Sequence, residues 1–179
     1  MRIIRGSRKG KILYPPPNLP VRPTTDAAKE GLFNIIEHNW EIDGLKVLDL
    51  FAGTGNISLE FVSRGCAEVI AIDHNARCID WIRDVARQLK FENLYTIRSD
   101  VFAHISKPGR KHHIIFADPP YELQETLKIP DLVFNNNFLY PGGWLIIEHS
   151  EEFDFSAHPN FLRKKEYGKV NFSFFSGPD

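Results

Sequence analysis

Runs of apolar residues with the length of a β-strand recur along the chain, and segments with helical spacing separate them. The runs do not alternate between apolar and polar positions, which is typical of strands buried on both faces of a sheet. After the second run, residues 76–89 place apolar side chains at the spacing of a helix. Repeated strand and helix units of this kind predict a parallel, doubly wound α/β sheet. The runs are found at residues 46–51, 69–73, 94–97, 114–117 and 144–148.

The carboxyl-terminal part departs from this repeat. Residues 161–167 and 169–175 read as two strands joined by a tight turn at Gly168. Such a pair predicts an antiparallel hairpin. Together with the five apolar runs, this hairpin completes a mostly parallel sheet of seven strands.

The amino-terminal part precedes the sheet and carries its own turn signals. Residues 2–14 are expected to form a short β-hairpin that turns within residues 6–10. Three prolines at residues 15–17 follow and mark the best candidate boundary. We therefore divide the chain into a basic N-terminal hairpin extension at residues 1–20 and a larger domain at residues 21–179.

Composition excludes several classes of protein. The 179 residues are 42% hydrophobic and 25% charged, which fits one globular domain with a substantial core. No apolar run approaches the roughly 18 residues of a membrane span, and residues 1–6 lack the apolar centre of a signal peptide. We expect a soluble, cytoplasmic protein that is a monomer by default. Cys66 and Cys78 lack a metal-binding spacing, so reduced thiols and no metal are predicted.

Basic residues are distributed unevenly, although the net charge is only −1. This net charge argues against a protein that coats nucleic acid through bulk electrostatics, but it allows local patches. The first eleven residues contain no acid, and a second basic group lies at residues 163–169. On charge alone, a surface that contacts phosphates and an ordinary solvated surface are equally good interpretations. The candidate phosphate-contacting residues at this end are Arg2, Arg5, Arg8, Lys9, Lys11 and Arg22.

Three acidic residues lie at the ends of successive strands of the predicted sheet. The first strand contains Asp49 and runs into a turn with Gly53 and Gly55, and ligands of open parallel sheets bind beyond such strand ends. Asp73 ends the second strand, where a carboxylate can accept both hydroxyls of a ribose. Asp100 follows the third strand and can accept a hydrogen bond from the amine of an adenine ring. Together these acids predict a site for a nucleoside cofactor.

The glycine turn also bears on which nucleoside cofactor is bound. A nicotinamide or flavin dinucleotide needs Gly or Ala at the third glycine position, where this chain has Ser58. S-adenosylmethionine has no pyrophosphate and carries a sulfonium and an ammonium group, for which Asp49 is a suitable counter-charge. The pattern favours the methyl donor and leaves a nicotinamide-dependent oxidoreductase open.

The fourth strand ends in Asp118-Pro119-Pro120-Tyr121, a sequence that removes two backbone donors. The ionised Asp118 carboxylate and the Pro119 carbonyl are acceptors, and the ring-fixed φ angles hold the carbonyls in place. Such a pocket suits an amino group on a flat ring on which Tyr121 stacks. Hydrogen bonds to both N–H groups return electron density to the nitrogen, which can then attack a methyl group. Asp118 can stabilise the developing positive charge and take the proton that is released.

These residues resemble the class I S-adenosylmethionine-dependent methyltransferases, and in particular those that methylate amino groups with an Asp/Asn-Pro-Pro-aromatic motif. The chain as a whole resembles the bacterial RsmD family, which methylates the 2-amino group of one guanine in small-subunit (16S) ribosomal RNA. Residues 22–26, of sequence RPTTD, are the most specific part, because the motif at residues 118–121 also occurs in adenine and cytosine methyltransferases. The stretches that carry the resemblance are residues 2–4, 10–11, 22–26, 32–34, 47–55 and 118–121.

The resemblance implies a Rossmann-like fold, S-adenosylmethionine as cofactor, and the small ribosomal subunit or its rRNA as partner. The implied catalytic residues are Asp118, Pro119, Pro120 and Tyr121. The implied cofactor-binding residues are Asp49, Phe51, Ala52, Gly53, Thr54, Gly55, Asp73, His74, Asp100, Val101 and Thr25. Arg22, Thr24 and Thr25 are implied at the mouth of the active site, where cofactor and RNA meet. Thr24 and the basic residues at positions 2, 5, 8, 9, 11 and 22 are the implied contacts with substrate RNA. The loop at residues 122–125 departs from the family because it is acidic.

Alternatives remain open on the sequence alone. Within the same enzyme class, the substrate can be adenine in DNA or RNA, or a protein glutamine, although Asp rather than Asn at position 118 disfavours glutamine by resemblance. Two further alternatives come from other classes. They are the nicotinamide-dependent oxidoreductase and a non-catalytic RNA-binding module that uses the basic N-terminal segment.

Overall fold

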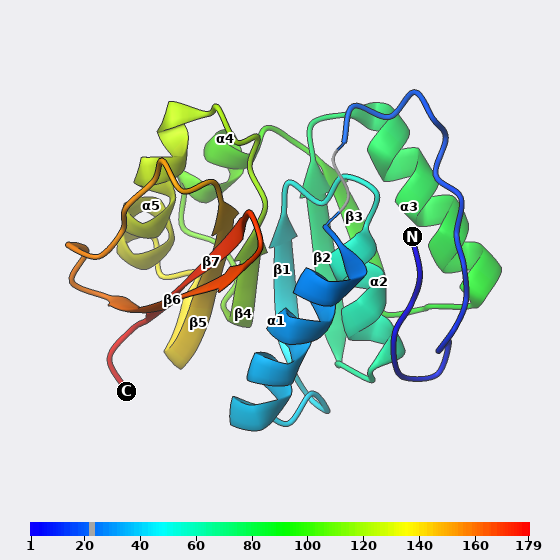
Figure 1. Cartoon of the computed structure of the whole chain (residues 1–179), viewed down its shortest axis with the longest axis horizontal. Helices are drawn as coiled ribbons and strands as arrows, with labels where there is room; N and C mark the ends of the chain where they lie inside the picture. Colours follow the sequence, from blue (N-terminus) through cyan, green and yellow to red (C-terminus); the bar gives the residue numbers. More distant parts are fainter. Residues whose placement is uncertain (22–23) are drawn as a thin grey trace.

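A seven-stranded sheet runs through the centre of the computed structural model, which describes residues 1–21 and 24–179 (Figure 1). The strand order is β3-β2-β1-β4-β5-β7-β6; β1 to β5 are parallel, and β7 is antiparallel to both β5 and β6. The predicted mostly parallel α/β sheet with an antiparallel C-terminal hairpin is confirmed. The strands are β1 (Lys46–Leu50), β2 (Glu68–Asp73), β3 (Leu94–Arg98), β4 (His112–Ala117), β5 (Leu139–His149), β6 (Phe161–Tyr167) and β7 (Val170–Ser176).

Helices cover both faces of the sheet, as the apolar strands require. Buried side chains of α1, α2 and α3 pack on one face, and those of α4 and α5 pack on the other. Helix α1 begins after Thr25, whose hydroxyl accepts a hydrogen bond from the Ala28 N–H at 3.2 Å. The helices are α1 (Asp26–Asn39), α2 (Asn56–Ser63), α3 (Ala76–Leu89), α4 (Val101–Ile105), the 3₁₀ helix η1 (Gln124–Lys128) and α5 (Ile129–Asn135).

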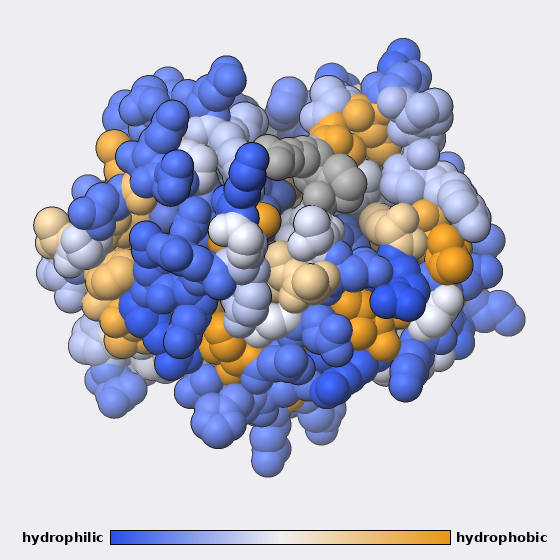
Figure 2. Space-filling view, viewed as in Figure 1, coloured by the Kyte–Doolittle hydropathy of each residue, from blue (hydrophilic) through white to orange (hydrophobic). Residues whose placement is uncertain are grey.

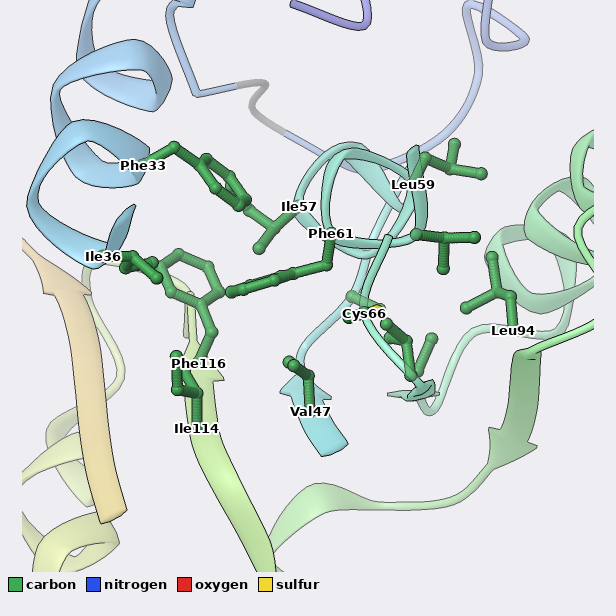
Figure 3. Close-up of a cluster of buried hydrophobic side chains, with 14 of the residues drawn as sticks. Phe33, Ile36, Val47, Ile57, Leu59, Phe61, Cys66, Leu94, Ile114 and Phe116 are labelled. Atoms are coloured by element: carbon green, nitrogen blue, oxygen red, sulfur yellow. The ribbon is translucent and has the colours of Figure 1, made fainter. Parts of the chain in front are cut away.

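The core beneath α1 and α2 is closed by aromatic side chains (Figure 3). Phe33 of α1 and Phe61 of α2 meet edge to face, with ring centroids 4.7 Å apart, and Phe116 of β4 belongs to the same buried cluster. Such an aromatic pair stabilises the fold by about 0.5–1.5 kcal/mol beyond the burial of its area. This packing fixes the positions of the two helices that begin beside the carboxyl ends of β1 and β4.

The register of the parallel strands brings their carboxyl ends to one edge of the sheet. Leu50 of β1 pairs with Ile72 of β2 on one side and with Ala117 of β4 on the other, and Ala117 also pairs with Ile147 of β5. The turn after β1 is tight because Gly55 adopts a φ of 75°, and a Cβ at this position would lie 2.8 Å from the Ile82 side chain. The residues that follow these strands therefore share one site.

The first residues of the chain are docked on α2. The expected hairpin is reduced to one bridge between Arg2 and Ile12, with flanking backbone hydrogen bonds. The Glu60 carboxylate of α2 accepts hydrogen bonds from the N–H groups of Ile4 and Arg5, at 2.9 and 3.0 Å. The division into an extension and a domain at residue 20 stays a prediction.

The distribution of hydrophilic and apolar residues on the surface is shown for one face of the molecule in Figure 2. The face drawn in Figure 2 is mostly hydrophilic, with apolar residues in separate groups. Across residues 1–21 and 24–179, no helix combines the length and the apolar character needed to cross a bilayer.

Candidate active site

A cavity of about 340 Å³ lies at the carboxyl ends of β1, β2, β4 and β5. Its volume falls in the range of small-molecule sites, about 300–1,000 Å³. It brings together residues that are far apart in the sequence: the segment before α1, the glycine turn, the end of β2 and the turn after β4. The predicted site residues that line it are Thr24, Thr25, Asp49, Phe51, Ala52, Gly53, Thr54, Asp73, His74, Asp118, Pro119, Pro120 and Tyr121.

Three predicted cofactor-binding residues lie outside the described lining of this cavity. Gly55 caps the start of α2, with its backbone against Ile82. Asp100 is exposed and caps α4 by accepting a hydrogen bond from the Ala103 N–H at 2.8 Å. Val101 is buried in the core between the sheet and α4. Their contact with a cofactor stays a prediction, and Arg22 lies outside the described residues.

Asp73 joins the end of β2 to the glycine turn. Its Oδ2 accepts a hydrogen bond from the Gly53 N–H at 2.9 Å, and its Oδ1 accepts one from the Asn75 N–H at 2.8 Å. A carboxylate has about four acceptor positions, so each oxygen can still accept a hydrogen bond from a ligand hydroxyl. This geometry allows Asp73 to position the turn and to bind a ribose at once.

Asp49 lies deeper, where it is only 1% exposed. Its Oδ2 accepts hydrogen bonds from both the N–H and the hydroxyl of Ser58 in the first turn of α2. Burial raises the pKa of Asp49 to about 7, although the two donors of Ser58 act in the opposite direction. Ser58 therefore replaces the small residue of dinucleotide-binding turns for a local reason, because it supplies donors to a buried acid.

The turn after β4 holds the predicted catalytic residues at the same cavity. The Asp118 N–H donates to the Leu50 carbonyl at 3.3 Å, which ties this turn to the end of β1. Pro119 is buried, whereas Pro120 is exposed. The Tyr121 hydroxyl donates to Oε1 of Glu148 at 3.3 Å. The acceptor groups predicted from the sequence are thus assembled beside the glycine turn.

Glu148 of β5 is a lining residue that sequence analysis missed. The sequence pattern predicts only the end of an apolar strand at this position, yet Glu148 lines the cavity and is 3% exposed. The Thr24 hydroxyl donates to its Oε2 at 2.9 Å. Its signal in the sequence was a carboxylate at the end of a buried strand, the same signal that identified Asp73.

The charges of the cavity have one sign. Among the described lining residues there are four carboxyl groups, and neither lysine nor arginine is present. A site of this kind favours ligands with positive charge and amino groups, and it disfavours a pyrophosphate. The four lining acids are Asp49, Asp73, Asp118 and Glu148.

The basic N-terminal residues are partly engaged within the chain. Arg2 pairs with Asp26 at 3.3 Å, and Arg5 pairs with Glu37 at 3.0 Å. The Arg8 guanidinium donates to the carbonyl of Leu89 at the end of α3, at 2.7 and 3.1 Å. Lys9 and Lys11 are exposed. These contacts dock the segment on α1 and α3, and its contact with RNA stays a prediction.

Comparison with known proteins gives the family. A family model described as Conserved hypothetical protein 95 matches residues 1–176. The chain belongs to this family. The predicted resemblance to RsmD proteins is confirmed, because the Ribosomal RNA small subunit methyltransferase D of Escherichia coli is 32% identical over 151 residues, which cover 83% of this chain and 71% of that protein. The Bacillus subtilis protein YlbH is 31% identical over 175 residues and 94% of each chain.

Solved structures described as methyltransferases share the fold of this chain. The Escherichia coli protein yhhF superposes with a TM-score of 0.86 at 28% identity, covering 99% of this chain and 98% of that one. A 16S rRNA N2 G1207 methyltransferase of Thermus thermophilus, solved with AdoMet and guanosine, gives a TM-score of 0.73 at 17% identity. It covers 89% of this chain and 45% of that one, and at this identity the likeness concerns the fold.

Proposed function

We propose that this protein transfers a methyl group from S-adenosylmethionine to the 2-amino group of a guanine in small-subunit (16S) ribosomal RNA. The observation that carries the proposal is the cavity where the acceptor groups of Asp118 and Pro119 meet the glycine turn. Family relatives named Ribosomal RNA small subunit methyltransferase D support the reaction and the class of RNA. We further propose that the protein acts as a cytoplasmic monomer on the small ribosomal subunit or its rRNA.

The residues present fit S-adenosylmethionine. When bound, it supplies a methyl group on a positively charged sulfur. Asp49 offers a counter-charge to an ammonium group, and Asp73 offers acceptors to ribose hydroxyls. Gly53 lines the cavity with a φ of 56°, a backbone conformation that favours glycine, and a Cβ there would lie 3.1 Å from the Val21 side chain. Among the described residues, no group of three His, Cys, Asp or Glu side chains could hold a metal.

The residues after β4 act on the base. Asp118 and the Pro119 carbonyl accept hydrogen bonds from the amino group, which orients the nitrogen and concentrates its electron density. As the nitrogen forms a bond to the methyl carbon, the bond between that carbon and the sulfonium sulfur would break and leave a neutral thioether. The nitrogen would then lose one proton, for which Asp118 is the acceptor. The ring of Tyr121 stacks on the base and stabilises the positive charge that develops on it.

Tyr121 allows the role of its ring to be separated from that of its hydroxyl. We expect Tyr121→Ala to lower kcat/KM about 10–100-fold, because base stacking stabilises by about 1–3 kcal/mol. Tyr121→Phe should cost less, since it keeps the ring and loses one long hydrogen bond to Glu148. Methyl transfer rates of the two variants test this order. Equal losses would show that the hydroxyl, rather than the ring, carries the function.

The raised pKa of Asp49 predicts a pH dependence of cofactor affinity. Near pH 7 the ligand-free carboxyl is partly protonated, since its pKa is about 7, and a bound ammonium favours the ionised form. Binding therefore releases a proton, and affinity should rise with pH up to about 7 by at most about tenfold per pH unit. Calorimetry at pH 6.5 in two buffers with different ionisation enthalpies measures this release. If Asp49→Asn releases as many protons as the wild type, the proton comes from another group.

Methyl transfer to ribosomal particles tests the proposed function. Purified protein and S-adenosylmethionine with a labelled methyl group are mixed with small subunits that lack the modification. We expect label in the RNA of these subunits and none in large subunits, which serve as the control. Unlabelled RNA from a preparation in which an active relative succeeds would contradict the proposal and favour the RNA-binding module.

A further inference from the structure

Glu148 is a cavity-lining carboxylate to which the reaction above assigns no role. It is the second-last residue of β5 and is almost completely buried. Its two oxygens accept hydrogen bonds from different elements, Oε2 from the Thr24 hydroxyl and Oε1 from the Tyr121 hydroxyl. Burial of a carboxylate costs free energy, and these donors lower that cost and fix its direction. A polar group held in this way at a cavity is typical of ligand recognition.

Glu148 lies beside the predicted amino-group pocket. Ala117 of β4 pairs with Ile147 of β5 in a parallel register, so the next residues, Asp118 and Glu148, follow on neighbouring strands. Such strands are about 4.8 Å apart. Both side chains line the same cavity. Two carboxylates on adjacent strands can therefore contact adjacent groups on the edge of one base.

The bases with amino groups differ in the ring nitrogen beside that group. In guanine the nitrogen on the Watson–Crick side of this group, N1, carries a hydrogen and is a donor, whereas N3 on its other side has a lone pair. In adenine and cytosine the equivalent nitrogen has a lone pair and is an acceptor. A carboxylate beside the amino-group pocket forms a second hydrogen bond with guanine and repels the lone pair of the other two bases. Enzymes that extrude a base read its Watson–Crick edge with contacts of this kind.

We propose that Glu148 selects guanine by accepting a hydrogen bond from N1–H while Asp118 and the Pro119 carbonyl hold the 2-amino group. This inference rests on the proposed function, because it assigns the substrate preference of the same site. Thr24 and Tyr121 are positioning residues, since their hydroxyl groups direct the carboxylate. The carboxylate thus rejects adenine and cytosine, which the acceptor pocket at Asp118 would otherwise admit.

The test uses a base that keeps the 2-amino group of guanine but has a hydrogen-bond acceptor instead of a donor at N1. In 2-aminopurine, the 2-amino group is retained and N1 has a lone pair. Small subunits are reconstituted from rRNA that carries either guanine or 2-aminopurine at the methylated position. The wild type should favour guanine by at least about 100-fold, since sites built to bond a donor reject analogues without it. Glu148→Gln should reduce this ratio about 100-fold or more, because its amide can donate to N1 of 2-aminopurine.

The ratio of the two substrates separates recognition from folding. Both rates come from one enzyme preparation, so a lower folded fraction changes each rate equally and leaves their ratio unchanged. Glu92→Gln is the matched control, because Glu92 is exposed and precedes β3 at the opposite edge of the sheet. We expect this variant to keep both rates of the wild type.

The other possible results distinguish failure of the Glu148 inference from failure of the proposed function. Equal losses on both substrates in Glu148→Gln would make Glu148 a structural residue and refute the inference while the proposed function stands. A wild type that methylates guanine and 2-aminopurine equally would refute it as well. A wild type that methylates neither, in particles that an active relative modifies, would refute the proposed function and the inference with it.

Discussion

Asp118→Ala is expected to lower the turnover of methyl transfer about 100-fold or more, because it removes an acceptor for the reacting amine and for its proton. The affinity for S-adenosylmethionine should change little, since Asp118 follows β4 whereas Asp49 and Asp73, the cavity acids predicted to bind the cofactor, lie in β1 and β2. Turnover under saturating cofactor and the cofactor Kd from calorimetry measure the two effects separately.

Asp73→Ala is the matched comparison, because it removes a carboxylate from the same cavity at the end of β2. It should weaken cofactor binding more than it lowers turnover, since it removes acceptors for a ribose and the hydrogen bond to the Gly53 N–H. The opposite pattern in the two variants would show that the roles of Asp73 and Asp118 have been exchanged.

Glu60→Ala is expected to cause the largest loss of stability. Glu60 is completely buried and pairs with Lys29 at 3.2 Å and with Arg64 at 2.8 Å, and it also accepts the N–H groups of Ile4 and Arg5. Removing one partner of a buried ion pair costs about 3–5 kcal/mol, because the remaining charges lose their compensation. At about 2–4 °C per kcal/mol, the Tm should fall by about 6–20 °C.

Calorimetric unfolding measures this loss, and Glu166→Ala is the control. Glu166 is exposed in β6 and pairs with the exposed Lys164, so its removal should leave the Tm unchanged. A Tm of Glu60→Ala close to that of the control would mean that water replaces the lost carboxylate and that Glu60 does not hold the N-terminal segment on α2.

The buried ion pairs of Glu60 are connected to the cavity through Lys29. Lys29 donates to Asn56 Oδ1 at 2.8 Å and to the Arg2 carbonyl at 2.6 Å, and burial lowers the pKa of its ammonium group. Asn56 lines the cavity and donates to the Thr24 carbonyl at 3.4 Å. The N-terminal segment is therefore joined to the site by direct contacts.

The bounds of elements whose apolar residues recur at a regular spacing could be predicted from the sequence to the exact residue. Helix α3 occupies residues 76–89 because its buried side chains recur at helical spacing, and β6 occupies residues 161–167. The acids at strand ends were also predictable, since parallel register places them at one edge. Strand β5 begins at Leu139 rather than Trp144, because Pro141 and two glycines interrupt its apolar pattern although the backbone continues.

Features that depend on tertiary neighbours could not be predicted in this way. The role of Ser58 as a donor to Asp49 requires the contact between β1 and the first turn of α2. The ion pairs of Arg2 and Arg5 depend on α1 lying beside the N-terminal segment. Glu148 becomes a site residue only because β5 adjoins β4. Charge and spacing along the chain do not encode these distances.

The most direct test of the central claim is the identity of the methylated nucleoside. Small subunits that lack the modification are treated with the protein and labelled S-adenosylmethionine, the RNA is digested, and the nucleosides are separated and analysed by mass. We expect label in 2-methylguanosine with the wild type and no label with Asp118→Ala. Label in a methylated adenosine or cytidine would keep the pocket of Asp118 as the catalytic centre and contradict guanine as its substrate.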